Sequence, residues 1–201
     1  EDLLPRKSKN LDKKMLRVGA TMLRQRGAAA LSVREVAKKA GVNLGMFNYY
    51  FKDKNEFIKT ILEDTYSPFI TELRENQTHN LEDVLFSMAK FSRNHHQTVL
   101  SLLGDALAGE KNVVRFLQKN FSTHFAILFE ELTIHFEENR YDSKYLEHAF
   151  RYLISSVGLP NLMAGFKIKM NPKLKQKLDD DETLRRRVRS AMSSLEFICK
   201  D

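Results

Sequence analysis

The sequence contains very few cysteines, prolines and glycines. Its 201 residues include one cysteine, Cys199, with four prolines and eight glycines. A single cysteine excludes an internal disulfide framework and is typical of a protein in the reducing cytosol. Proline and glycine are the residues that interrupt helices, so their scarcity allows long helices over most of the chain.

Long apolar runs and a signal sequence are also missing. The first ten residues, EDLLPRKSKN, lack the apolar segment of a secretory signal. The longest stretch without a charged residue, residues 152–166, is shorter than a membrane span and contains Gly158 and Pro160. We therefore expect a buried helix there, no membrane segment and a cytoplasmic location.

The excess positive charge is confined to the first quarter of the chain. Residues 1–55 hold thirteen Lys and Arg against five Asp and Glu, a net charge of +8. Residues 56–201 hold twenty against twenty-one, a net charge of −1. This asymmetry predicts a small basic domain, residues 1–55, followed by a nearly neutral domain, residues 56–201. It also favours a polyanion such as nucleic acid as the partner. A tail that only improved solubility would not show the helical pattern that this segment has.

The basic segment has the pattern of short helices joined by a tight turn. Leu11 begins an apolar face with helical spacing, and Gly27 is a typical helix end. Ser32 and Glu35 form a capping box for a second helix, and Asn43 is a suitable N-cap for a third. The turn at residues 40–42 contains Gly41, which tolerates a positive φ. This is the spacing of a helix-turn-helix.

The same pattern separates an inward set of side chains from an outward set. The inward set is Val36, Ala37, Ala40, Val42, Phe47, Tyr50 and Phe51. The outward set is Leu44, Gly45, Met46, Asn48 and Tyr49. Amide and phenol groups on an exposed helix can form hydrogen bonds with bases and phosphates. This explains why Asn48 and Tyr49 follow directly after Phe47. The alternative is a three-helix scaffold with no role in nucleic-acid binding.

The stretch LSVREVAKKAGVNLGMFNYYFKDKNEF resembles the signature of the TetR family of bacterial transcriptional regulators. The resemblance covers about residues 11–60, and the rest of the chain is similar in length and helical character. It implies that Arg34 reaches a base or a phosphate, and that residues 44–46 line the major groove. It also implies that Tyr49, Tyr50 and Lys54 hold the phosphate backbone. The full DNA-binding set that we expect is Ser32, Val33, Arg34, Asn43, Leu44, Gly45, Met46, Asn48, Tyr49, Tyr50 and Lys54.

The sequence departs from the family pattern within this stretch. The family usually has tyrosine at the position of Asn48 and often histidine at that of Tyr50. Leu44 and Met46 replace residues that are commonly polar or small. Base reading is therefore expected to use apolar contacts with thymine methyl groups, together with Asn48 on adenine. These departures concern the target sequence rather than DNA binding itself.

Helical spacing continues through the rest of the chain, so the predicted fold is all-α. We expect a DNA-binding domain of three helices, followed by a helical bundle for effector binding and dimerisation. The expected helices lie at about residues 54–75, 80–91, 112–136, 145–166 and 184–198. Residues 179–181 are acidic and suit the start of the last helix, while residues 185–187 are arginines that we expect to be solvated.

Twelve of the fourteen phenylalanines lie after residue 55. In the resembled family this domain holds a small effector, which predicts an apolar or amphipathic molecule here. The candidate lining residues are Phe86, Phe91, Phe121 and Phe125. The alternative is that these side chains simply fill the core.

A homodimer is expected, because one helix-turn-helix touches few base pairs and two copies can read successive major grooves. Two apolar helices from each subunit would form a four-helix bundle. The interface residues that we expect are Leu153, Ile154, Val157, Val188, Met192 and Leu195.

No metal, cofactor or catalytic site is expected. His79, His95, His96 and Cys199 lack a further ligand at suitable spacing. Asp105 either hydrogen-bonds an effector or faces solvent, and no phosphate loop or nucleophile with a base is recognisable.

The leading hypothesis is a transcriptional repressor that is not an enzyme, and that a small effector releases from a palindromic operator. The alternative is a helical ligand-binding or adaptor protein whose basic module contacts other proteins.

Overall fold

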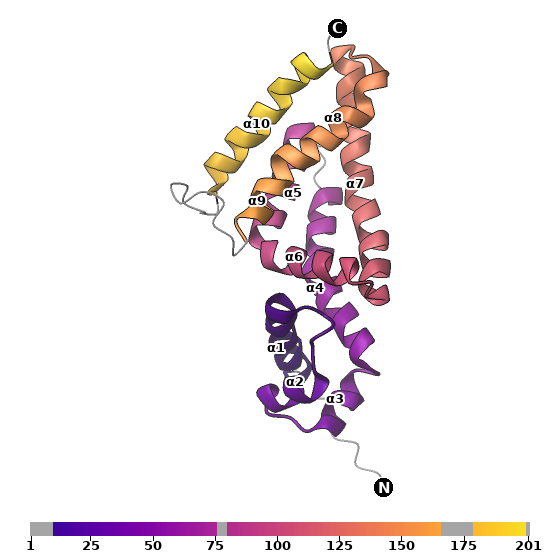
Figure 1. Cartoon of the computed structure of the whole chain (residues 1–201), viewed down its shortest axis with the longest axis vertical. Helices are drawn as coiled ribbons and strands as arrows, with labels where there is room; N and C mark the ends of the chain where they lie inside the picture. Colours follow the sequence, from indigo (N-terminus) through magenta and orange to yellow (C-terminus); the bar gives the residue numbers. More distant parts are fainter. Residues whose placement is uncertain (1–9, 76–79, 166–178, 200–201) are drawn as a thin grey trace. The chain divides into compact units, whose positions relative to one another are not determined.

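A computed structural model of the chain describes residues 10–75, 80–165 and 179–199. In these ranges the structure is helical and contains no strand, which confirms the all-α prediction (Figure 1). None of the helices there is long and apolar enough to cross a bilayer. In chain order the elements are α1 (Leu11–Arg26), α2 (Val33–Ala40), α3 (Leu44–Tyr50), α4 (Lys54–Glu75), α5 (Leu81–Asn94), α6 (His96–Leu107), α7 (Lys111–Asn139), η1 (Ser143–Tyr145), α8 (Leu146–Leu153), η2 (Ile154–Gly158), α9 (Leu159–Met163) and α10 (Asp181–Ile198).

By packing, the chain divides into two compact units. The first comprises residues 1–67 and 101–116, and the second comprises residues 68–100 and 117–201. The helices α4, α6 and α7 therefore each contribute residues to both units. The predicted domain boundary after residue 55 lies inside the first unit and stays a prediction.

The core of the first unit is built from α1, α2, α3 and the first half of α4. Met15, Val36, Phe47 and Phe57 are fully buried in it. At Gly19 an added Cβ would lie 2.5 Å from the ring of Phe57, so α1 and α4 approach closely because residue 19 has no side chain. The resulting scaffold fixes the position of the helix-turn-helix.

In the second unit α10 packs on α5, α8 and η2 (Figure 1). Its apolar face, with Leu184, Val188, Ala191 and Leu195, is buried as the four-three spacing predicts. Asp180 caps the helix by accepting a hydrogen bond from the Thr183 amide at 2.8 Å. This confirms the predicted acidic start of the last helix.

The helix expected over residues 145–166 is helical but not uniform. It consists of η1, α8, the π-helical η2 and α9, while Phe166 lies outside the described residues. Pro160 has no N–H to donate into the preceding turn, which favours a change of helical winding there. In the same segment the carbonyl of Val157 accepts from the side chains of Asn161 at 3.3 Å and Arg187 at 3.4 Å.

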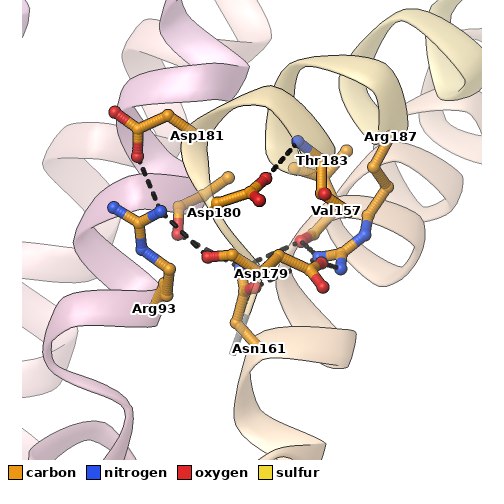
Figure 2. Close-up of polar contacts among 9 residues, drawn as sticks. Arg93, Val157, Asn161, Asp179, Asp180, Asp181, Thr183 and Arg187 are labelled. Carbon is orange, nitrogen blue, oxygen red and sulfur yellow. Dashed lines mark hydrogen bonds and ion pairs between the residues drawn. The ribbon is translucent and has the colours of Figure 1, made fainter. Parts of the chain in front are cut away.

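Arg187 is the centre of a polar network that the sequence does not predict. Figure 2 shows its guanidinium pointing at the Val157 carbonyl, the side-chain oxygen of Asn161 at 3.1 Å and the carboxylate of Asp179. Arg93 donates to the Asp179 carbonyl at 3.0 Å and pairs with Asp181. Burial lowers the pKa of Arg187. The expectation that residues 185–187 are solvated is thus wrong for Arg187.

Arg185 is exposed, as expected, although its guanidinium also lies 3.8 Å from the centre of the Phe86 ring. Arg186 is exposed and pairs with Glu182 on its own helix, as expected of a solvated arginine. The physical reason is that α10 turns Arg185 and Arg187 toward α5 and η2, and Arg186 away from them.

Candidate nucleic-acid interface

The second helix of the helix-turn-helix begins at a side-chain cap. Ser32 has an extended backbone, and its hydroxyl accepts from the Glu35 amide at 3.4 Å. The Glu35 carboxylate binds Lys39 at 2.9 Å and Arg26 at 3.0 Å. The hydrogen bond from Lys39 and the neighbouring Arg26 hold the pKa of Glu35 below its usual value. Glu35 therefore joins the end of α1 to α2 rather than completing the expected capping box.

The turn between the two helices has the expected geometry. Gly41 has a φ of 68°, the left-handed conformation that glycine adopts without steric cost. The Val42 amide donates to the Ala37 carbonyl at 3.0 Å, so the chain reverses within three residues. Asn43 then caps α3 by accepting from the Met46 amide at 2.8 Å. These local bonds fix where α3 starts.

The buried side of α3 is aromatic. Phe47 is fully buried, and its ring centre lies 5.0 Å from that of Phe57 and 5.3 Å from that of Phe51. Most of the expected inward set is buried with it. Val42 and Tyr50 are half-buried instead, because both lie at an end of the short helix.

The other side of α3 faces solvent. Leu44, Gly45, Asn48 and Tyr49 are exposed, and Leu44 and Tyr49 keep 40% and 44% of their surface. Met46 is half-buried. Exposed apolar side chains are typical of a binding surface. Together with an amide they match the methyl and polar groups on the edges of bases in the major groove.

At the start of α2, Ser32 and Arg34 are exposed and Val33 is half-buried. Basic side chains surround this part of the first unit and are also exposed: Lys13, Lys14, Arg17, Arg24, Arg26, Arg34, Lys38, Lys39 and Lys52. The positive charge that the sequence concentrates here is therefore on the surface, where it can attract phosphate.

Lys54 differs from these lysines. It is half-buried, and its ammonium group donates to the Ala29 carbonyl at 3.0 Å. The start of α4 is capped by Asp53, which accepts from the Glu56 amide at 2.9 Å. The Glu56 carboxylate accepts from the Lys52 amide at 2.7 Å, which fixes the chain just before this cap.

The four phenylalanines expected to line an effector pocket lie in two places. Phe91, Phe121 and Phe125 belong to an aromatic cluster with Phe69 and His124. Phe69 stacks on Phe91 at 4.3 Å, and His124 lies 5.2 Å from Phe121 and 4.2 Å from Phe125 between ring centres. Burial lowers the pKa of His124 to about 4. Phe86 is separate, under Arg185.

Most of the expected dimer residues are buried within their own unit. Leu153, Val157, Val188 and Leu195 retain at most 3% exposure, so they cannot line a surface for a partner. Ile154 and Met192 are half-buried. Helical spacing reveals that a face is buried, but it does not reveal whether the same chain or a second copy covers it.

The histidines and Cys199 do not form a metal site in the described ranges, where no three His, Cys, Asp or Glu side chains are grouped to hold an ion. His79 lies outside those ranges. Asp105 does not face solvent: it is buried and accepts a hydrogen bond from the Ala28 amide. Sequence analysis missed this contact, since 77 residues separate the two partners.

Comparison with known proteins decides what this arrangement is. Residues 15–61 match the family model described as "Bacterial regulatory proteins, tetR family". The similarity to this family is therefore carried by the segment that holds the helix-turn-helix. The matched segment runs from residue 15 within α1, through the helix-turn-helix, to the first part of α4.

A curated relative is the probable HTH-type transcriptional regulator YttP of Bacillus subtilis (strain 168). It is 26% identical over 92 residues, which cover 42% of this chain and 44% of the relative. The matched stretch thus spans less than half of that relative's length.

Solved structures extend the likeness of fold to the whole chain. A transcriptional regulator from Aquifex aeolicus VF5 aligns with a TM-score of 0.68 at 19% identity, over 92% of this chain and 99% of that one. A TetR transcription regulator from Haloarcula marismortui ATCC 43049 aligns with a TM-score of 0.69 at 16% identity, over 95% and 99%. Salmonella enterica GusR aligns with a TM-score of 0.65 at 15% identity, over the full length of both chains.

Proposed function

We propose that the chain is a transcriptional repressor that binds a palindromic operator in double-stranded DNA as a homodimer. The observation that carries this proposal is the exposed face of α3, held by a capped helix-turn-helix inside the segment that matches the tetR model. The protein would act in the cytoplasm, at the nucleoid when it is bound.

In this function α3 is the recognition helix. Leu44 and Met46 present apolar surface that suits thymine methyl groups, and Gly45 between them lets the backbone approach the groove. The side-chain amide of Asn48 can donate from its nitrogen to N7 of adenine and accept at its oxygen from the N6 amino group. This bidentate pairing identifies adenine. The exposed amide on the middle of α3 therefore supplies the sequence preference.

The remaining residues hold the DNA backbone and the helix starts. Arg34 supplies an exposed positive charge, with Val33 beside it, and the phenols of Tyr49 and Tyr50 offer donors to phosphate oxygens. Ser32 and Asn43 already cap α2 and α3, so their role is to aim both helix starts at the DNA. Lys54 is a phosphate contact of the same kind, discussed below.

The decisive experiment selects bound sequences from random duplex DNA with the full chain. We expect a palindromic consensus with half-sites about 10 base pairs apart from centre to centre, or a multiple of it, and affinity that falls steeply with salt. Binding with no salt dependence and no consensus would contradict the proposal and favour the helical adaptor.

For the dimer we propose an exposed side of α10, because four of the six interface residues read from the sequence are buried within their own chain, while Ile154 and Met192 are half-buried. On α10, Arg186, Ser190, Ser193 and Phe197 form an exposed stripe, and Phe197 keeps 86% of its surface. A surface hollow lies along this stripe, lined in part by Arg189. The two serines let a second helix approach closely, and Phe197 supplies apolar area, so we assign the dimer contact to this side of α10.

The dimer proposal is tested with Phe197→Asp, measured by sedimentation at micromolar concentration. The variant should be a folded monomer, since residue 197 makes little contact within its own chain. Leu107→Asp is the matched control, because Leu107 is 91% exposed and lies in the first unit. A Phe197→Asp dimer as tight as the wild type would exclude this side of α10.

A small apolar or amphipathic effector is proposed to bind in the second unit and to oppose operator binding. The support is the aromatic cluster of Phe91, Phe121, Phe125 and their neighbours, whose rings a ligand would have to part. A coupling of about 1–3 kcal/mol between ligand and DNA is typical of such proteins. Native mass spectrometry of the purified chain should detect a retained ligand, and its addition should weaken operator binding. A ligand-free chain whose operator affinity no apolar compound alters would contradict this.

A further inference from the structure

Asp105 is a buried carboxylate that the DNA-binding surface does not use. It lies near the end of α6, in the part of that helix that belongs to the first unit, and keeps 8% of its surface. Its Oδ2 accepts a hydrogen bond of 2.6 Å from the Ala28 amide. A bond this short between an amide and a carboxylate oxygen is a close hydrogen bond. The carboxylate is thus hydrogen-bonded to the backbone that follows α1.

Gly27 shows how closely the carboxylate approaches that backbone. An added Cβ at residue 27 would lie 2.8 Å from Oδ1 and 3.0 Å from Oδ2 of Asp105, distances too short for a side chain. Gly27 also has a φ of 82°. A side chain at residue 27 would strain the backbone and collide with the carboxylate. The close approach of Asp105 therefore depends on glycine at this position.

A second side chain of α6 acts one turn earlier. The Ser101 hydroxyl donates to the Leu23 carbonyl at 3.1 Å, in the last turn of α1. Residues 101 and 105 lie on the same face of a helix. Together they bond to the Leu23 carbonyl, which also accepts from the Gly27 amide at 2.9 Å, and to the second amide of the loop at residues 27–30.

A side chain of α4 also holds this loop. Lys54 donates to the Ala29 carbonyl, next to the residue that Asp105 binds. Close by, Asn112 donates to Asn55 at 2.9 Å, and a hollow of about 220 Å³ lies between Ala28, Lys54 and Val113 among others. The loop therefore forms one hydrogen bond with a carboxylate of α6 and another with an ammonium group of α4.

We propose that Asp105 is a positioning residue for DNA binding. By fixing the loop at residues 27–30 it fixes the entry to α2, whose first residues include Ser32 and Arg34. It touches no DNA itself. This inference rests on the proposed function, and it adds a residue to that function from outside residues 15–61.

The sign of the effect on DNA affinity separates positioning from plain electrostatics. Removing a negative charge from a protein that binds phosphate should strengthen binding if charge alone matters. Removing an anchor should weaken it, because the start of α2 is no longer held in place. Since no phosphate contact is lost, the salt dependence should not change.

The test compares three variants of the full chain on the selected duplex. Asp105→Ala removes the acceptor, and Asp105→Asn keeps the shape and one acceptor oxygen but not the charge. Asp64→Ala is the control, since Asp64 is an exposed carboxylate of the same unit. Operator affinity is measured over a range of salt, and hydrogen exchange of the Ala28 amide is measured without DNA.

Asp105→Ala should weaken operator binding by about tenfold, with an unchanged salt slope and faster Ala28 exchange. Asp105→Asn should lie between this variant and the wild type in both measurements, which also serves if Asp105→Ala does not fold. Asp64→Ala should bind as the wild type does or more tightly. Unchanged or tighter binding by both Asp105 variants would overturn the proposal, as would Ala28 exchange that neither variant alters.

The two proposals fail in different ways. A wild-type chain that binds no duplex would refute the proposed function, and with it any role of Asp105 in DNA binding. Protection of the Ala28 amide in that chain, lost in Asp105→Ala, would still show that the carboxylate holds the loop.

Discussion

The ammonium nitrogen of Lys54 lies 3.0 Å from the carbonyl oxygen of Ala29 and donates a hydrogen bond to it. An ammonium group has three N–H donors, so this bond leaves capacity for a phosphate oxygen. Lys54 can therefore make the proposed contact to DNA while it keeps its contact within the fold.

Lys54→Ala should therefore have two separable effects. Loss of a phosphate contact should weaken binding to all duplexes and lower the salt slope by about one unit. Loss of the bond to Ala29 should lower the free energy of unfolding by about 1 kcal/mol. Lys59→Ala is the control, because Lys59 is an exposed lysine of α4 whose described partner is Glu63. Weaker binding at an unchanged salt slope would mean that Lys54 acts only through Ala29.

Asn48→Ala should relax the sequence preference rather than weaken binding in general. If Asn48 pairs with adenine, the loss should be about 1–3 kcal/mol on the operator and close to zero on random duplex. Replacing the adenine that Asn48 reads should then change the binding free energy of Asn48→Ala very little. The same base change should weaken binding by the wild type about as much as Asn48→Ala does. Equal losses on operator and random DNA would refute base reading by Asn48.

Asn161→Ala tests the polar network of Figure 2. The Asn161 side chain donates to the Ala89 carbonyl at 3.1 Å and accepts from Arg187, and it is 2% exposed. Its loss leaves buried polar groups without a partner, so the free energy of unfolding should fall by about 2 kcal/mol in urea denaturation.

Arg186→Ala is the control for this network, since Arg186 is exposed and pairs only along its own helix in the described contacts. It should change the free energy of unfolding by less than about 1 kcal/mol. Similar losses in the two variants would mean that the buried network adds nothing to stability.

Stability should fall in mild acid because of His124. Burial lowers the pKa of His124 from 6.5 to about 4, so between these values the unfolded chain binds more protons than the folded one. This contribution is complete above pH 6.5 and is lost as the pH falls, by roughly 2 kcal/mol at pH 5. The pKa values of His95 and His135 are lowered by burial too, and they act in the same direction.

His124→Phe separates this residue from the other histidines. Phenylalanine suits the surrounding rings and does not titrate, so the fall in unfolding free energy between pH 7 and pH 5 should shrink by about 2 kcal/mol. Denaturant titrations at both pH values measure it. A pH dependence identical to that of the wild type would show that His124 is not the responsible group.

The sequence by itself determined the features that depend on neighbouring residues. Ser32 and Asn43 were readable as helix caps because each side chain bonds to an amide three residues later. Gly41 was readable as the turn because only a residue without a side chain adopts its φ freely. The helix-turn-helix and its exposed face are local in this sense, so the sequence located them.

Only the tertiary structure decided which surfaces are covered and by what. Leu153 and Val188 have the pattern of an interface, but α5, α8, η2 and α10 of one chain bury that pattern among themselves. Arg187 and Asp105 looked solvent-facing because their partners are distant in sequence: Asn161 is 26 residues from Arg187, and Ala28 is 77 residues from Asp105. Periodicity reports whether a side chain is buried, while the identity of its partner depends on how helices far apart in the chain pack together.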